Sequence, residues 1–583
     1  MEKKTAPERS PSPAASPATE STKTRDEDTT PKESDQDVAP APLEPERERT
    51  ALQTAVLMFA LCASVFLAAL DVTIVTTALP TISSYFKTSM AYTWVGSAYM
   101  LSSAASTPIW GKVSDIWGRK PILLVVSAIF FFGSALAAAA INIDMLIAGR
   151  AVQGLGGGGL LTLVNICISD LFSMRNRAKY YGFIGMTWAF ASAIGPILGG
   201  VLTEKVSWRW CFYINLPITG VAFFIIAFLL HLDTPKTPVV TGLLVVDWLG
   251  SISIAGATVM FLLGLTLGGV IHPWDSPIVL CMLIFGPLLF LVFLAIEWKV
   301  AKYPIMPLEM FENPSNIASL LGVFFHGMMM VIGSFFVPLY FQSVLGATAL
   351  LSGVWLLPLA LSLSFSSAGT GLYISKTGRY MDCIRGAFTL SIVGFGLLYD
   401  LPLGKTWSKI IIYQIICGLG VGPNFQSLLL ALQNQVKPHH YASVTATLGF
   451  TRNLATAIGV VVGNVVFQNS MLKEEPHLKA SLSPQAAEML SGKNAESSVF
   501  FVNTLPALQR DIARAAYYAS LRNVWLTAVA FAAGGLISCV FIKGRELSKV
   551  HEKVETGLEA EERKARERKA AAETKTAGEK DIV

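Results

Sequence analysis

The sequence predicts an all-α membrane protein that crosses the bilayer many times. Of its 583 residues, 52% are hydrophobic and 15% are charged, whereas soluble domains carry about 25% charged residues. The charge is also uneven, because residues 51–542 hold only 44 of the 85 Lys, Arg, Asp and Glu residues. So little polar surface over so long a stretch excludes a soluble globule. It also excludes intrinsic disorder for the middle of the chain.

Two charged tails flank this apolar middle. Residues 1–50 are rich in Pro, Ser, Thr and Glu and show no apolar periodicity, so they cannot bury a core. No short apolar stretch follows Met1, and we therefore expect no cleavable signal peptide. The second tail, residues 543–583, has alternating charges over 561–569 that suit a solvated helix. We expect both tails to be disordered apart from such a helix.

Between the tails the chain contains fourteen apolar stretches of spanning length, about 20 residues each. Their apolar runs are continuous rather than alternating, which predicts helices and not a β-barrel. The fourteen stretches lie near 54–78, 92–111, 121–141, 145–168, 181–202, 211–231, 247–269, 277–297, 317–341, 350–374, 384–402, 408–431, 442–468 and 521–542.

The fourteen spans divide into two six-helix halves and an inserted pair. We assign spans 1–6 to an N-terminal half over 51–232 and spans 9–14 to a C-terminal half over 313–542. Residues 233–312 then hold spans 7 and 8 with their linkers. Two such halves around a central site are a transporter plan.

The charges of the short loops predict the orientation in the membrane. Loops on the side of the tails carry thirteen Lys and Arg residues, and short loops on the other side carry five. By the positive-inside rule both termini are cytosolic, and the long loop 470–520 is extracellular or lumenal. The basic residues on the tail side are Lys112, Arg119, Lys120, Arg175, Arg177, Lys179, Lys236, Lys299, Lys302, Lys376, Arg379, Arg385 and Lys437.

Several functional classes are excluded by what the sequence lacks. The seven cysteines form no CxxC or Cys/His cluster, so we predict neither disulfides nor a metal site. No nucleophile–base pairing and no nucleotide-binding loop is present, so we expect no enzyme, no cofactor and no use of ATP. The net charge of +5 is split between tails and middle, and it does not indicate nucleic-acid binding.

Charged residues inside apolar spans are few, and each is expensive to bury. Asp71 lies in span 1, Arg150 in span 4 and Arg452 in span 13. A buried carboxylate can bind and release a proton, whereas arginine stays charged and can bind an anion or balance a carboxylate. Asp71 and Arg150 are therefore a candidate proton site, with a static ion pair as the alternative. Arg452 has no evident partner, and a structural role is as well supported as one in substrate binding or gating. For His326 in span 9 a structural role is favoured.

Five motifs in this order resemble those of a known family. The stretch Leu70–Pro80, which reads LDVTIVTTALP, resembles the first-span signature of the fourteen-span drug:proton antiporters of the major facilitator superfamily, with Thr76 at a usual Asn position. Residues 111–120 (GKVSDIWGRK) are similar to the loop 2–3 motif, and Arg150 with Gln153 and Gly154 is similar to the span 4 motif. Residues 191–200 resemble the span 5 antiporter motif, with Ala191 at a usual Gly position. Residues 208–217 are typical of the fourteen-span group.

The resemblance covers about residues 50–545 and implies roles for the residues that match. Asp71 and Arg150 are the implied proton-coupling pair. The loop 2–3 residues form the implied cytosolic latch: Gly111, Asp115, Gly118, Arg119 and Lys120. Gly111 and Gly118 suit a tight turn, and the alternative for the loop is a basic topogenic signal. The implied antiporter motif contains Gly195, Pro196, Gly199 and Gly200. We expect the proline to bend span 5 and the last two glycines to admit a partner helix.

Polar and aromatic residues within the spans suggest a substrate cavity. Our candidates for its wall are Gln153, Trp188, Asn424, Gln426 and Arg452. Residues 340–346 and 422–426 resemble fungal members of the group, including pumps that export secondary metabolites such as mycotoxins.

The leading functional hypothesis is proton-coupled efflux of hydrophobic or amphipathic small molecules by alternating access. An alternative is a carrier of basic amino acids or other small polar solutes, which the scarcity of acidic residues in the spans disfavours. A non-transporting receptor is a third possibility, but it leaves the ordered motifs unexplained. We expect a monomer in the lipid bilayer, driven by the proton gradient. The plasma membrane is the expected location and the vacuolar membrane the alternative.

Overall fold

The computed structural model describes residues 50–580, apart from 89, 233, 270, 496–497 and 552–553. The predicted disorder of the N-terminal tail therefore lies outside the described residues, Thr50 excepted. Residues 51–583 form one compact unit. Within the described part the chain is helical throughout its membrane-spanning region, which confirms the all-α fold.

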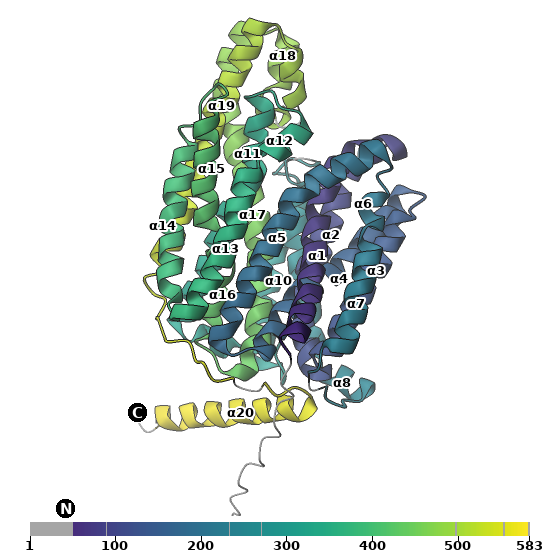
Figure 1. Cartoon of the computed structure of the whole chain (residues 1–583), viewed down its shortest axis with the longest axis vertical. Helices are drawn as coiled ribbons and strands as arrows, with labels where there is room; N and C mark the ends of the chain where they lie inside the picture. The colour runs from purple at the N-terminus through teal and green to yellow at the C-terminus, as the bar shows by residue number, and fades with distance from the viewer. Residues whose placement is uncertain are drawn as a thin grey trace, which may run out of the picture. The chain divides into compact units, whose positions relative to one another are not determined.

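The first half contains six spanning segments, of which the sixth is divided at Ile214 (Figure 1). They are α1 (Ala51–Phe86), α2 (Met90–Trp117), α3 (Arg119–Ala138), α4 (Ile143–Leu171), α5 (Met174–Lys205), and α6 (Trp210–Tyr213) followed by α7 (Asn215–Leu229). Within this half α1 packs against α5 and α7, and α4 packs against α2 and α3. The middle of α1 is thereby enclosed by other helices of the same half.

The second half also contains six segments, and two of them consist of consecutive helices. They are α11 (Pro314–Ser343), α12 (Ala349–Trp355) with α13 (Leu357–Thr377), α14 (Tyr380–Leu398), α15 (Trp407–Val421) with α16 (Asn424–Gln433), α17 (Tyr441–Ser481) and α19 (Ala507–Ser538). We call the end of the bundle that carries α20 (Leu558–Lys580) and α8 (Val239–Val245) the tail side. The opposite end, with α18 (Pro484–Met489), is the far side (Figure 1).

Each of the fourteen predicted spans coincides with one helix or a pair of consecutive helices. Thirteen of them are long and apolar enough to cross a membrane. The exception is α2, which has 28 residues but is less apolar. Its polar side chains Ser103, Ser106 and Thr107 are buried, because α2 packs against α4, α9 and α17. A helix that faces other helices does not need the apolar surface that lipid requires.

The two halves meet along α5 with α13 and along α2 with α17. On the tail side Arg177 of α5 donates to Gln433 Oε1 at 3.0 Å, and Arg175 donates to Ser375 O at 2.9 Å. A Cβ atom at Gly182 of α5 would lie 3.0 Å from the Cα atom of Gly371 in α13. These contacts join the two halves on the tail side.

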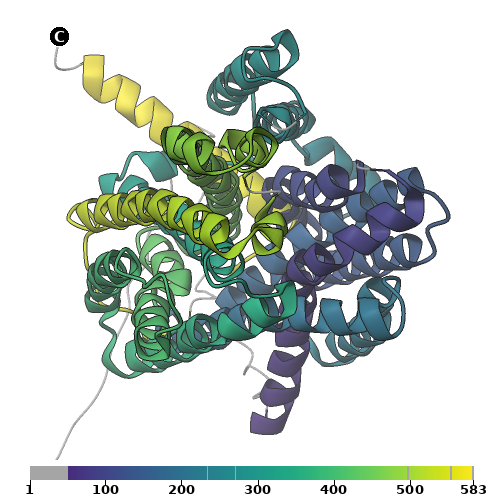
Figure 2. The ribbon, with the colours of Figure 1, turned by 90° about the horizontal axis from the view of Figure 1, so that it is seen from above.

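The inserted pair consists of α9 (Trp248–Leu267) and α10 (Pro277–Lys299), which pack against each other. Helix α9 also contacts α2 and α17, so the pair lies against the outside of the two halves (Figure 2). Most of the apolar side chains of α10 are exposed, including Ile284, Phe285 and Leu288. We conclude that α10 presents a surface suited to lipid.

Residues 470–520, which we predicted to be a long loop outside the membrane, are largely helical. Helix α17 continues to Ser481, α18 follows, and α19 already begins at Ala507. With 41 residues α17 is about 60 Å long, whereas the hydrocarbon core of a bilayer is about 30 Å thick. Lys and Glu residues end the apolar pattern of the span after residue 468, but they leave its helix intact.

The C-terminal tail contains a helix where the alternating charges predicted one, but this helix has specific partners rather than a fully solvated surface. Helix α20 starts next to Gly557, whose amide donates to Asp115 O at 2.8 Å. Glu561 is buried and pairs with Lys112 of α2, and Lys564 lies 3.9 Å from Asp115. The charged face of the start of α20 is therefore held on the tail-side end of α2.

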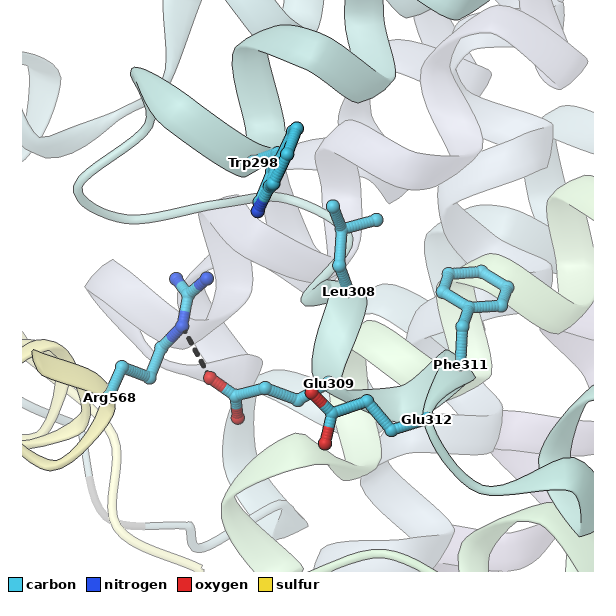
Figure 3. Close-up of a pocket in the computed structure, with 6 residues that line it drawn as sticks. All are labelled: Trp298, Leu308, Glu309, Phe311, Glu312 and Arg568. Atoms are coloured by element: carbon cyan, nitrogen blue, oxygen red, sulfur yellow. Dashed lines mark hydrogen bonds and ion pairs between the residues drawn. The ribbon is translucent and has the colours of Figure 1, made fainter. Parts of the chain in front are cut away.

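A second contact of α20 lies further along the helix. Arg568 Nε donates to Glu309 Oε1 at 2.7 Å, beside a surface hollow lined by Trp298, Leu308 and Phe311 (Figure 3). Glu309 belongs to the segment that joins α10 to α11. Helix α20 thus connects the first half to the linker that leads into the second.

We expect the Glu561 contact to hold α20 in place. Burial alone raises the pKa of the Glu561 carboxyl, but the nearby ammonium groups of Lys112 and Lys564 hold that pKa well below its usual range. The lowered pKa means that docking is strongest above the ordinary value near 4.5 and weakens as the pH falls below it. We expect Glu561→Lys to increase tryptic cleavage after Lys564 about tenfold or more. The Lys112→Glu/Glu561→Lys double variant should reverse this, and an unchanged cleavage rate in the single variant would contradict the docking.

Candidate functional site

The centre of the first half holds a buried carboxylate with three hydrogen-bond donors. Asp71 of α1 has an exposed fraction of 0%, and its Oδ2 pairs with Nη1 of Arg150 from α4. Gln153 Nε2 donates to Asp71 Oδ1 at 2.7 Å, and Asn215 Nδ2 from α7 donates to the same atom at 3.2 Å. The two amides also donate to Ser134 Oγ of α3, at 2.8 Å and 3.4 Å respectively. Three donors fit an ionised carboxylate, because that group only accepts hydrogen bonds.

The guanidinium of Arg150 is fixed on its other sides. Its Nε donates to Val95 O at 2.9 Å, and its Cζ lies 4.6 Å from the ring centroid of Tyr99 and 5.7 Å from that of Phe212. The Tyr99 hydroxyl in turn donates to Ala68 O at 3.2 Å. The ion pair and its contacts therefore connect α1, α2, α4 and α6. A change in the charge of Asp71 alters contacts in all four helices.

Loop 2–3 contains a buried ion triad. Gly118 has φ +91°, which allows the chain to turn between α2 and α3. Arg119 lies 2.7 Å from Asp115, and its Nε lies 2.8 Å from Asp170 at the end of α4. Its Nη1 also donates to Ser114 Oγ at 2.8 Å. Two of the predicted latch residues, Asp115 and Arg119, thus contact each other, and Asp170 is a third member that the motif did not indicate.

Two other residues of the predicted latch have different positions from those expected. Gly111 is not part of the turn, since it lies within α2. A Cβ atom there would be 2.8 Å from Ala446 Cβ and 3.3 Å from Ala442 O of α17. Gly111 thus permits the contact between the halves on the tail side. Lys120 is partly buried at the start of α3 and takes no part in the ion triad.

The span 5 motif presents two faces to two different neighbours. Gly195 and Gly199 face α1, where added Cβ atoms would collide with Thr73 Oγ1 and with Ile74 O. Helix α5 remains one continuous helix through Pro196.

The other two motif residues face α12 of the second half. The Cβ of Pro196 would lie 3.6 Å from a Cβ atom at Gly353, and a Cβ atom at Gly200 would lie 3.6 Å from Leu350 Cδ1. The predicted close approach of a helix is therefore right for Gly199 and wrong for Gly200. The spacing of four residues, rather than adjacency, places Gly195 and Gly199 on one helix face.

Near mid-span a second polar cluster surrounds Phe425, where the halves meet. Arg452 of α17 is partly buried, its Nη2 donates to Phe425 O at 2.5 Å, and its Cζ lies 4.6 Å from the centroid of the Phe425 ring. Trp188 of α5 lies 5.0 Å from the same ring between centroids. His326 of α11 has its ring 6.3 Å away in an edge-on arrangement. We call Asn165, Trp188, His326, Phe425, Gln426 and Arg452 the Arg452 cluster.

The predicted cavity residues divide between three places. Trp188, Gln426 and Arg452 belong to the Arg452 cluster, with Gln426 Nε2 donating to Asn165 Oδ1 at 3.5 Å. Gln153 is instead part of the buried Asp71 network. Asn424 points into the second half, where its Nδ2 donates to Ile384 O of α14 at 3.5 Å. The expectation that Gln153 and Asn424 line a cavity is therefore wrong, because a polar residue in an apolar span does not indicate which face it occupies.

Comparison with known proteins identifies the family. The sequence model described as Major Facilitator Superfamily matches residues 61–245 and 248–460. The chain belongs to this superfamily. It is 50% identical over 509 residues to "Efflux pump dotC" of Dothistroma septosporum, with 87% of each chain covered. It is 47% identical over 521 residues to "MFS-type transporter ppz2" of Metarhizium majus, covering 89% of this chain and 90% of the relative.

The solved structures agree with the fold. The proton:xylose symporter XylE is similar with a TM-score of 0.52 and 14% sequence identity, over 86% of this chain and 98% of XylE. At that identity the similarity shows the fold alone. Membership of the Major Facilitator Superfamily confirms the predicted family, and the chain is a multi-pass membrane transporter rather than an enzyme.

The sequence analysis did not predict several residues of the Asp71 network, the ion triad and the Arg452 cluster. Asn215 and Ser134 complete the Asp71 network, Asp170 completes the ion triad, and Phe425 is the centre of the Arg452 cluster. Asp170 lies just beyond the end of a predicted span, a position that suggests a partner for a loop arginine. Phe425 carried no signal, because one phenylalanine among many in apolar spans cannot be singled out.

The adjacent glycines at 199 and 200 allow a matched test of the α1–α5 contact. Alanine raises helix propensity equally at both positions. We expect Gly199→Ala to lower stability by about 1–3 kcal/mol because its Cβ meets α1. Gly200→Ala should be neutral or stabilising, since its Cβ makes an ordinary contact with Leu350. Thermal unfolding of both purified variants measures the difference, and equal midpoints would refute the contact.

Proposed function

We propose that this chain is a proton-coupled efflux transporter that exports hydrophobic or amphipathic small molecules by alternating access. The observation that carries the proposal is Asp71, a mid-span carboxylate in α1 whose donors come from α4 and α7. The printed name of the dotC relative, an efflux pump, supports the direction of transport. The similarity extends over most of both chains, so the whole transport unit is shared.

The hydrogen bonds of Asp71 suggest how a proton is coupled to a change of shape. A protonated carboxyl has a hydroxyl donor, but Arg150, Gln153 and Asn215 all present donors to it. Protonation therefore removes the charge that holds Arg150 and leaves one donor facing another. The resulting loss of contacts between α1, α4 and α7 favours a second arrangement of these helices. Release of the proton from Asp71 to the other side of the membrane restores the ion pair with Arg150.

The described arrangement corresponds to the state that is closed on the tail side. The hydrogen bonds of Arg175 and Arg177, the close approach of α17 at Gly111 and the docked α20 lie on that side. We propose that the tail side is cytosolic, as the loop charges predict. In that orientation Asp71 takes its proton from outside, and the cargo leaves toward the far side. The plasma membrane, a monomeric state and the proton gradient as sole energy source complete the proposal.

A carrier of basic amino acids fits the geometry poorly. Such a cargo needs carboxylates at the meeting surface of the halves, and the charged member of the Arg452 cluster is a cation. Like charges repel strongly where water is excluded. The exporter of apolar or amphipathic cargo is therefore the function that we propose.

Reconstituted vesicles test this function directly. The full chain is placed in liposomes with an acidic compartment facing the far side, and a panel of fluorescent amphipathic compounds is offered on the tail side. We expect movement toward the acidic compartment with the gradient and none after an ionophore collapses it. Proton release into the tail-side compartment should accompany cargo movement. Cargo movement that is equally fast without a gradient would overturn the proton coupling.

A further inference from the structure

The guanidinium of Arg452 lacks an anionic partner within the part of the chain that the structure describes. Among the residues that the structure describes, no carboxylate lies within ion-pair distance of it. Its protein contacts are one carbonyl oxygen, that of Phe425, and the face of the Phe425 ring. Its Nε is buried without a hydrogen-bond partner. A positive charge in an apolar span is costly, and here that cost is not offset by a counter-ion.

Two fully buried arginines of the chain show how such a charge can be satisfied. Arg150 pairs with Asp71. Arg177, at the tail-side end of α5, lacks a carboxylate but donates from Nε, Nη1 and Nη2 to Phe172 O, Gln433 Oε1 and Ser169 O at 2.8–3.3 Å. Arg452 is satisfied in neither way. Its charge and its Nε therefore lack an acceptor among the described residues, and an acceptor from a bound molecule would satisfy both.

Arg452 stands where the two halves meet. The Phe425 ring beneath its guanidinium contacts Trp188 of the first half, and a Cβ atom at Gly185 would lie 3.5 Å from Phe425 Cδ1. Gln426 reaches Asn165 of α4. A molecule that contacts Arg452 and these rings therefore touches both halves, as a cargo must in order to be handed from one arrangement to the other.

The same cluster offers unpaired acceptors next to the cation. His326 uses Nε2 to donate to Val421 O at 3.0 Å, so its buried Nδ1 is a bare acceptor without a partner. The buried Oε1 of Gln426 also has no partner. The cluster thus combines one fixed positive charge, two hydrogen-bond acceptors and the faces of Phe425 and Trp188.

We propose that the Arg452 cluster selects planar aromatic molecules that carry an anionic oxygen, a carboxylate or a phenolate, together with a hydroxyl group. Arg452 binds the anionic oxygen, the rings of Phe425 and Trp188 stack on the aromatic plane, and His326 or Gln426 accepts from the hydroxyl. The cation disfavours positively charged cargo of the same shape. This inference deepens the proposed function, because it names the cargo class of the same transporter.

Binding to the purified full chain tests the inference without transport. The probes share one ring system: 1-hydroxy-2-naphthoate, its neutral methyl ester, and a naphthylmethyl-trimethylammonium cation. Equilibrium dialysis in neutral detergent, with empty micelles as blank, measures saturable binding. We expect the acid to bind about tenfold or more tightly than the ester or the cation.

Two variants and a control assign that preference to one residue. Arg452→Gln should weaken binding of the acid about tenfold or more and leave the ester unchanged, and Arg452→Lys should retain part of the preference. The control is Arg522→Gln, because Arg522 also stacks on an aromatic ring, that of Tyr399 at 3.8 Å, but lies outside the cluster. It should leave the preference intact.

Several outcomes would overturn the inference. Wild-type protein that binds the ester or the cation as tightly as the acid refutes it, and this comparison needs no variant to fold. A folded Arg452→Gln protein that keeps full acid binding refutes it as well. The proposed function fails separately: a protein that prefers the acid through Arg452 but moves no cargo with a pH gradient would contradict proton-coupled efflux and leave the cluster's selectivity standing.

Discussion

Asp71→Asn is expected to abolish gradient-driven transport while leaving cargo exchange at equal pH intact. Asparagine keeps the size of the side chain and its carbonyl oxygen, but it cannot bind or release a proton. It resembles the protonated carboxyl and leaves Arg150 without its anion. We expect the initial rate of cargo transport under a pH gradient to fall about 100-fold, to the level of empty vesicles, because the variant lacks a proton site that transport requires.

The exchange measurement makes this prediction specific. Labelled cargo inside vesicles should still exchange with unlabelled cargo outside, because that reaction needs no net proton movement. Ser134→Ala is the matched control, since Ser134 belongs to the same network but carries no titratable group. Normal gradient-driven transport by Asp71→Asn would show that the pair with Arg150 is static. Loss of exchange together with a lower unfolding temperature would indicate a structural role.

Arg119→Ala should have the largest effect on stability. Arg119 lies between Asp115 and Asp170 and is itself buried, so its loss leaves two buried carboxylates without their partner. Breaking a buried ion pair in this way costs about 3–5 kcal/mol. We expect a clear fall in unfolding temperature and in the amount of protein in the membrane. Helix α20 should also be released, because the Asp115 carboxylate lies beside Lys564 and the backbone carbonyl of Asp115 accepts from the Gly557 amide.

The neighbouring Lys120 provides a close control. Lys120→Ala removes the same charge from the same loop, so it affects the positive-inside signal equally. It takes no part in the triad, and the variant should behave like the wild type. Equal loss of protein in both variants would mean that the loop acts through its net charge. A stable, fully abundant Arg119→Ala protein would refute the triad as a structural lock.

The sequence allowed the Asp71–Arg150 pair to be predicted because charge within an apolar span is rare and costly. It also singled out Asp115 and Arg119 as latch residues, through the resemblance, and these two residues form an ion pair in the structure. It did not distinguish the two faces of a helix, and for that reason Gln153, Asn424 and Gly200 received the wrong neighbours. Periodicity was uninformative in these spans, since they are apolar on every side.

Partners far apart in the chain were beyond prediction for a different reason. The Lys112–Glu561 pair joins residues separated by 449 positions, and both of its members look like ordinary surface charges in the sequence. The isolation of Arg452 from any carboxylate is likewise a property of the folded chain. Only packing reveals which of the available acceptors come close.

The sequence alone determined the membrane class, the fourteen spans, the family and the three mid-span charges. Burying polar groups in lipid is costly, so membrane-spanning segments are recognised from their composition and from the order of their residues. The tertiary structure decided which charges are neutralised and which is not. Asp71 and Arg150 are satisfied by each other, whereas Arg452 has no carboxylate partner among the described residues. That difference arises from the orientation of helix faces, which a uniformly apolar pattern leaves open.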